Sequence, residues 1–133
     1  MESGGGKQYL STDVMTAARA RVRKTLAAFP RFYVSVSGGK DSSALVQLVI
    51  EEARALGRLP VPILIVDLEA QYRHTVEFLE RLCAKTDEVT PYWVCLPIHL
   101  RNGVSQIQPH WLCWDESVRS LWVREYPEHP GVI

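Results

Sequence analysis

Residues 33–43 have the sequence Tyr33-Val34-Ser35-Val36-Ser37-Gly38-Gly39-Lys40-Asp41-Ser42-Ser43. The apolar, β-branched start predicts a buried strand, and the residues after the glycines predict the start of a helix. Two adjacent glycines allow a tight turn and let backbone N–H groups approach a ligand closely. The unpaired N–H groups and the positive dipole end of the new helix point at the same place. The stretch therefore predicts a strand–loop–helix unit with an anion site at the loop.

The spacing of the glycines separates this loop from two common nucleotide-binding loops. A Walker A loop has G-x-x-x-x-G-K-[ST] and a dinucleotide fingerprint has G-x-G-x-x-G, and neither pattern is present here. Lys40 adds a positive charge, and Ser37 and Ser42 add hydroxyl donors. The alternative interpretation is a serine and glycine turn followed by an ordinary helix cap, because Asp and Ser are common cap residues. A simple turn, however, does not need Gly-Gly, Lys, Asp and Ser together.

Apolar periodicity predicts alternating helices and strands along the chain. The predicted helices are 13–28, 42–56 and 71–85, and the predicted strands are 32–36, 61–66 and 92–96. The run 61–66 is apolar throughout, as in a sheet covered on both faces. This order predicts an α/β fold, a Rossmann-like parallel sheet with helices on both faces. The inward positions predicted for the second helix are Leu45, Leu48, Val49, Ala53 and Leu56, widened by Val46 and Ile50.

Composition limits the class of protein. The chain has 133 residues, which predicts one domain over 11–133 after a flexible lead over 1–10. Its 15 basic and 15 acidic side chains balance, so no general attraction to nucleic acid or to a membrane surface is expected. No apolar stretch is long enough to span a bilayer and the N-terminus lacks a signal-peptide core, so a cytoplasmic protein is expected. Cys83, Cys95 and Cys113 form no C-x-x-C pair, so neither zinc nor an iron–sulfur cluster is expected.

The loop and several later segments resemble a known family. S-G-G-K-D-S at 37–42 is similar to the signature of the PP-loop ATP pyrophosphatases, also called adenine nucleotide alpha hydrolase-like proteins. The resemblance continues over residues 66–72, 91–97, 108–115 and 122–124, and covers the chain from about Thr16 onward. These segments look like the DUF3440 branch of the phosphoadenosine phosphosulfate (PAPS) reductase family, which includes proteins described as prophage co-activators and immunoglobulin-binding regulators.

The resemblance implies an adenine nucleotide, Mg-ATP, as the ligand, cleaved between its α- and β-phosphates. The implied binding residues are Ser37, Gly38, Gly39, Lys40, Asp41, Ser42, Asp67 and His99, with Lys40 and Asp41 as catalytic candidates. Asp41 either caps the helix or helps to hold Mg²⁺ through water. Asp67 either meets ribose or metal, or serves as the N-terminal charge of the next helix. These residues follow the carboxyl ends of parallel strands, so they are expected to converge on one crevice.

Two classes of function are open. One is an ATP-using enzyme that transfers an adenylyl or sulfate group to an unknown acceptor. The other is a nucleotide-binding regulatory module that works with a DNA-binding partner. True sulfonucleotide reduction is less favoured, because no tail cysteine matches the family nucleophile and the loop for β- and γ-phosphates is intact. The family sheet has about five strands and three are predicted here, so a short or truncated form is expected, with a protein partner or a second copy at its open edge.

Two further groups of residues have open interpretations. The four tryptophans Trp93, Trp111, Trp114 and Trp122 either cover the sheet, which is favoured, or stack on adenine or nucleic-acid bases. The basic residues of the first helix, Arg19, Arg21, Arg23 and Lys24, form either a solvated face, which is favoured, or a weak nucleic-acid contact.

Overall fold

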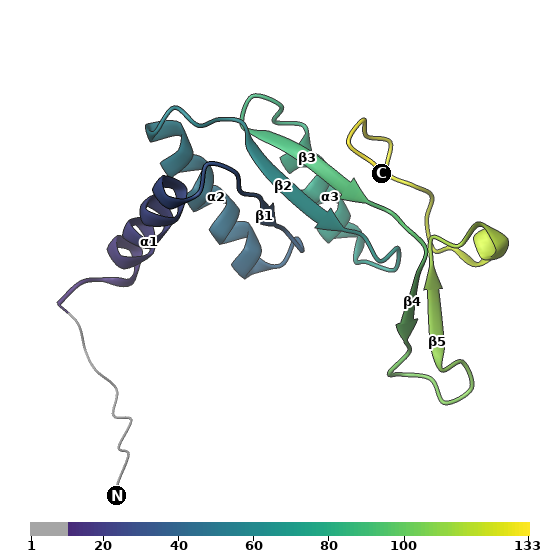
Figure 1. Ribbon diagram of the computed structural model, residues 1–133. Helices are drawn as coiled ribbons and strands as arrows, with labels where there is room; N and C mark the ends of the chain where they lie inside the picture. The colour runs from purple at the N-terminus through teal and green to yellow at the C-terminus, as the bar shows by residue number, and fades with distance from the viewer. Residues whose placement is uncertain (1–10) are drawn as a thin grey trace, which may run out of the picture.

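The computed structural model describes residues 11–133, so the predicted lead over 1–10 lies outside the described residues. The chain has a mixed α/β fold (Figure 1). Its elements are α1 (Val14–Ala28), β1 (Val34–Ser35), α2 (Lys40–Ala55), β2 (Val61–Val66), α3 (Arg73–Cys83), β3 (Val89–Val94), β4 (Ile98–Arg101), β5 (His110–Cys113) and a 3₁₀ helix, η1 (Glu116–Leu121). No helix among the described residues has the length and apolar character needed to cross a bilayer.

The sheet confirms the predicted parallel order. Strands β1, β2 and β3 lie side by side in that order and all run parallel. Residues 131–133 continue the sheet beyond β3, because Trp93 N–H donates to the Gly131 carbonyl (2.7 Å) and Ile133 N–H donates to the Trp93 carbonyl (2.8 Å). Residues 131–133 thus lie against β3, as a fourth parallel segment beside the three strands.

Strand β3 begins at Val89, earlier than the predicted start at Tyr92. Strand β3 therefore includes Pro91, although proline cannot donate to a ladder. The backbone N–H groups of Trp93 and Cys95 point away from β2, toward residues 131–133. Because the nitrogen of Pro91 has the same direction, its missing N–H costs no bond to β2 and the strand continues through it.

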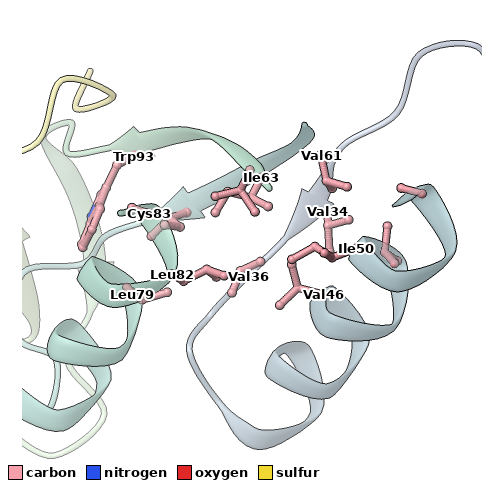
Figure 2. Packing of buried hydrophobic residues seen from close by; sticks show 14 of the residues in the cluster. Val34, Val36, Val46, Ile50, Val61, Ile63, Leu79, Leu82, Cys83 and Trp93 are labelled. Atoms are coloured by element: carbon pink, nitrogen blue, oxygen red, sulfur yellow. The ribbon is translucent and has the colours of Figure 1, made fainter. Parts of the chain in front are cut away.

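The core lies between the sheet and two helices, α2 and α3 (Figure 2). From the sheet, Val36, Ile63 and Ile65 are buried against these helices. The helices contribute Val46 and Ile50 from α2 together with Leu79, Leu82 and Cys83 from α3. A cluster of this size supplies the main favourable free energy of folding for a domain of this length.

The opposite face of the sheet carries no helix among the described residues, so the prediction of helices on both faces is wrong for this part of the chain. Burial alternates along β2, and on the outer side Val66 is 44% exposed and the neighbouring Tyr92 is 46% exposed. The continuous apolar run 61–66 does not reveal how many faces are covered. Helix α1 packs beside α2 (Figure 1).

Ion pairs explain the position of α1. Arg19 and Arg23 both reach the carboxylate of Glu52, which is 1% exposed, and Arg19 also pairs with Glu51. These contacts hold α1 against α2 and pair two of the four basic side chains with carboxylates, although the Arg23 side chain is still 61% exposed. Arg21 and Lys24 are exposed as well.

The buried stripe of α2 differs from the predicted one. Val46, Val49, Ile50 and Ala53 are buried, whereas Leu45 is 46% exposed and Leu56 is 48% exposed. The buried stripe is shifted by about one residue from the predicted stripe, and it includes Glu52. A carboxylate was not expected in the core, and its pairing with two arginines is what allows it there.

The tryptophans mostly confirm the core interpretation. Trp93 and Trp114 are fully buried. Trp114 stacks on Tyr126 at 4.6 Å between ring centroids, and Trp122 meets Trp114 edge-on at 5.1 Å. These rings join the C-terminal segment to the end of the sheet beyond β2 and β3.

Candidate functional site

The loop between β1 and α2 has the backbone that its two glycines predict. Gly38 has φ +77°, in the left-handed region that glycine adopts at no steric cost. Gly39 is extended (φ −76°, ψ 163°) and is the N-cap residue of α2, which makes no side-chain capping bond. Capping was one of the two interpretations of Asp41, and Asp41 does not cap the helix. It lies exposed in the first turn, where a negative charge interacts favourably with the helix dipole.

Serine hydroxyls hold the loop from inside. The hydroxyls of Ser42 and Ser43 donate to the Gly39 carbonyl at 3.1 and 2.8 Å. Ser37 Oγ lies 3.1 Å from Ser42 Oγ and accepts from the Gly39 N–H at 3.4 Å. The loop is thus closed by its own polar side chains before any ligand binds.

The backbone donors at the start of α2 are left without protein acceptors. Among residues 11–133, the first N–H of α2 that meets an acceptor is that of Ser43, which donates to the Gly39 carbonyl at 3.0 Å. The N–H groups of Lys40, Asp41 and Ser42 have no such acceptor within the described part of the chain. Lys40 is exposed beside them. This arrangement can bind an anion through backbone donors, the helix dipole and a lysine charge.

The two glycines differ in their surroundings. A Cβ on Gly38 would lie 2.6 Å from Cγ2 of Thr75, so Gly38 lies against α3. A Cβ on Gly39 would meet only Ser37 Oγ, at 3.5 Å. Gly38 is therefore needed for the protein's own packing, whereas the space at Gly39 stays open toward a ligand.

Asp67 is not in the open crevice where it was expected. It is 0% exposed, and its carboxylate accepts from the indole N–H of Trp93 (2.7 Å), the backbone N–H of Glu69 (2.8 Å) and the guanidinium of Arg124. Its backbone carbonyl accepts from the indole N–H of Trp114 at 2.7 Å. Both carboxylate oxygens are occupied, which does not favour the predicted contact with ribose or metal. The sequence analysis assigned the tryptophans to the core and gave Arg124 no partner, so this internal anion was missed.

Glu69, two residues later, is buried in the same region. It is 1% exposed and has φ +65°, unusual for a residue with a side chain. Its carboxylate accepts from the Val123 N–H at 2.6 Å, and its carbonyl accepts from Nε of Arg124 at 2.9 Å. Residues 122–124 thereby tie the C-terminal segment to the carboxyl end of β2.

His99 belongs to a different part of the molecule. It lies exposed on β4, in the hairpin that β4 and β5 form beyond the sheet (Figure 1). Hydrogen bonds from Ser117 lower the pKa of Asp115, and the His99 charge adds to that effect, so His99 is near Asp115. The structure brings together Ser37, Gly38, Gly39, Lys40, Asp41 and Ser42, but within residues 11–133 no hydrogen bond or ion pair joins Asp67 or His99 to them.

The cysteines are buried thiols. Burial, with the nearby Asp67 charge, raises the pKa of Cys95 to about 12, and burial raises the pKa of Cys83 to about 11. Burial also raises the pKa of Cys113. Such thiols are poor nucleophiles. Among residues 11–133, no group of three or more His, Cys, Asp or Glu side chains is placed to hold a metal ion.

Comparison with known proteins gives one curated relative. Over 121 residues the chain is 40% identical to the uncharacterized protein YbdN of Escherichia coli (strain K12). The match covers 90% of this chain and 29% of YbdN, so the chain spans less than a third of that protein's length. No family model matches the chain, and no solved structure matches it.

Proposed function

We propose that the chain is a PP-loop protein of the PAPS reductase type that binds Mg-ATP at Ser37–Ser42. The observation that carries the proposal is the set of backbone donors at Lys40, Asp41 and Ser42 that lack protein acceptors. They lie beside the Lys40 charge at an uncapped helix start. The Rossmann-like parallel arrangement expected of this family agrees with the order β1-β2-β3, in which the loop follows the first strand.

The loop suits a leaving pyrophosphate. In the proposed reaction an acceptor oxygen bonds to the α-phosphorus, the bond from that phosphorus to the bridging oxygen breaks, and pyrophosphate leaves with the electron pair. Donors fixed before the reaction stabilise the charge that develops on the leaving group. Lys40 and the loop N–H groups supply those donors. Asp41 is the exposed carboxylate of the loop, and as an oxygen ligand it fits Mg²⁺, which would neutralise phosphate charge.

A non-catalytic nucleotide-binding module is the second candidate. It is favoured by the burial of Asp67 and Glu69, whose carboxylates are engaged by the protein itself. In this reading nucleotide binding orders the loop for a protein partner, as in a transcriptional co-activator, and no turnover follows. We propose a cytoplasmic location for either function.

Calorimetric titration of the purified chain tests the proposal. Mg-ATP and PAPS are titrated separately into the wild type and into Gly39→Val, which places a side chain in the proposed path of the ligand and whose Cβ would meet only Ser37 Oγ, at 3.5 Å. Gly103→Val is the matched control, because nothing lies within 4 Å of a Cβ at Gly103 and it is in the hairpin turn. We expect Mg-ATP binding in the wild type and in Gly103→Val, and its loss in Gly39→Val.

The outcomes separate the alternatives. Preference for PAPS would move the proposal to the sulfonucleotide branch, and no binding by a folded wild type would overturn it. With binding established, release of pyrophosphate from Mg-ATP in the presence of cell extract distinguishes the enzyme from the binding module.

A further inference from the structure

A groove lies at one edge of the sheet, on the side of β1 away from β2. Its volume is about 450 Å³, and residues of α1, β1 and α2 line it, whereas none of β2 or β3 does. Strand β1 is the first in the order β1-β2-β3, so no strand of residues 11–133 lies beyond it (Figure 1). Tyr33 and Ser35 alternate with Val34 along β1, and all three line the groove. Because alternate residues point to opposite faces, the groove passes the strand edge itself.

Strand β1 pairs with β2 through alternate residues. The Val36 N–H donates to the Leu64 carbonyl at 2.9 Å, in the register that places Ser35 opposite Leu64. In a parallel ladder, the N–H and C=O of one residue point to the same side, and those of the next residue point to the other side. Ser35 therefore directs both groups away from β2, and so does Tyr33 two residues earlier.

This outer edge of β1 is unpaired. The backbone N–H and C=O groups of Tyr33 and Ser35 have no hydrogen-bond partner among residues 11–133. A row of such groups at a sheet edge is a template for a further strand. An extended segment would meet two donors and two acceptors here, with the spacing of an ordinary strand. The unpaired backbone therefore points to an added β-strand.

Apolar side chains line the groove beside this edge. Tyr33 is 62% exposed and Leu45 is 46% exposed, and Val22 and Phe32 are half-buried. Covering these side chains removes apolar surface from water, which is favourable. Since side chains alternate along a strand, the bound segment should carry apolar residues at every second position.

Arg21 gives the groove its charge. It is the one charged residue among the described residues that line it. Arg19 and Arg23 on the same helix pair with carboxylates of α2, whereas Arg21 is exposed and forms no ion pair within residues 11–133. A carboxylate on the bound segment would complement this charge.

We propose that the β1 edge binds an extended segment of a separate protein as an added strand, with alternate apolar side chains and a carboxylate near Arg21. The backbone of Tyr33 and Ser35 pairs with the segment, and the groove receives its apolar side chains. None of residues 37–42 lines the groove, so the proposal does not rest on nucleotide binding.

The test uses the peptide Ac-Glu-Thr-Val-Thr-Val-Glu-NH2 and the exchange of single backbone N–H groups with water, measured by NMR on the ¹⁵N-labelled chain. We expect a Kd of about 1 mM, because ordering so short a segment offsets much of the gain. At about 10 mM peptide, exchange at Ser35 should then slow by about tenfold. The exposed N–H of Gly103, in the hairpin turn, should keep its rate.

Two altered peptides separate backbone pairing from charge. Replacing the central Val-Thr with Pro-Pro removes two adjacent N–H groups, one of which faces the edge in either register. It should reduce the slowing at Ser35 to less than about twofold. Replacing both glutamates with glutamine keeps the strand and should weaken binding by about threefold, as for an exposed ion pair.

Variants of the chain test the same two contacts. Ser35→Pro removes an edge donor without removing a bond to β2, and exchange at Tyr33, which should slow by less than about twofold, reports on binding. Slow exchange of the Val36 N–H shows that this variant is folded. Arg21→Glu should weaken binding by about threefold or more. Arg81→Glu, on α3 and outside the groove, should not.

Several outcomes would overturn the proposal. They are unchanged exchange at Ser35 in the wild type, equal slowing by the proline peptide, and full binding by a folded Ser35→Pro chain. Slowing at Ser35 that rises with chain concentration in the absence of peptide would assign the edge to a second copy instead. Gly39→Val should leave every titration unchanged, so failure of the nucleotide proposal is distinguishable from failure of this one.

Discussion

Gly38 and Thr75 are in such close contact that a Cβ on the glycine would lie 2.6 Å from Cγ2 of the threonine. The two residues belong to the loop before α2 and to α3. The shape of the loop at residues 37–42 is therefore fixed from outside by a neighbouring helix, as well as from inside by its serines. Gly38 has both a positive φ and this close approach to Thr75, so any side chain at position 38 is disfavoured for two separate reasons.

Gly38→Ala should lower the free energy of unfolding by about 2–4 kcal/mol, from backbone strain together with the contact on Thr75. Gly57→Ala is the matched control, since Gly57 also has positive φ (64°) but has nothing within 4 Å of a Cβ. It should cost about 1 kcal/mol, from strain alone. Urea unfolding measures both, and equal losses would show that the Thr75 contact does not matter.

Lys40→Gln should weaken Mg-ATP binding about tenfold or more, because a hydrogen bond to a charged group is lost. Its affinity should also fall less steeply with added salt than that of the wild type. Lys85→Gln, in an ion pair with Glu88 beyond the end of α3, should change neither quantity. Calorimetry at two salt concentrations provides the measurement. The charge argument fails if the two variants behave alike.

Arg124→Met should destabilise the fold by about 3–5 kcal/mol, because it leaves the buried Asp67 carboxylate without its cation. The guanidinium also lies 4.9 Å above the Trp114 ring, so lost packing adds to the effect. Arg119→Met removes an exposed pair with Glu125 and should cost less than about 1 kcal/mol. Denaturant unfolding of the two variants compares them. Similar small losses would mean that Asp67 does not depend on Arg124.

Acid should weaken the contact between α1 and α2. Hydrogen bonds from Arg23, and then from Arg19, lower the pKa of Glu52 below its ordinary value of 4.5. The unfolded chain takes up this proton at higher pH than the folded chain, so the stabilisation is complete above about pH 4.5 and is lost as pH falls through the lowered pKa. Unfolding free energies measured from about pH 7 to about pH 3 should fall more steeply for the wild type than for Glu52→Gln. Glu51→Gln, at an exposed position, should keep the wild-type slope.

Thiol reagents should not modify the folded chain at neutral pH. All three cysteines are buried, and the pKa of Cys95 is about 12. A coloured disulfide reagent should report three thiols in denaturant and almost none in buffer over the same time. Rapid reaction of Cys113 in the native state would reopen the possibility of a nucleophilic cysteine.

Much of the fold could be predicted from periodicity. The helices, the parallel order and the loop follow from residues such as Gly38, Gly39 and the apolar run 61–66. The hairpin of β4 and β5 was missed, because each of its strands has four residues, which is too short for a clear periodic signal. The position of α1 was also missed, since it depends on a buried Glu52 that hydropathy assigns to the surface.

The candidate site also has a part that could be predicted from the sequence and a part that could not. Residues 37–42 are adjacent in sequence, so their local chemistry could be predicted directly. Asp67 could not be assigned correctly, because its partners are 26 and 57 residues away.

The bond between Asp67 and Arg124 also sets an order of events during synthesis. Asp67 leaves the ribosome 57 residues before its partner Arg124. Glu69 likewise leaves 54 residues before Val123, whose N–H it accepts from. Until those residues emerge, both carboxylates are better hydrated than buried. The nascent chain can form its helices early, but the aromatic end of its core closes last. A chain interrupted before residue 122 would expose this half-built end to chaperones and proteases.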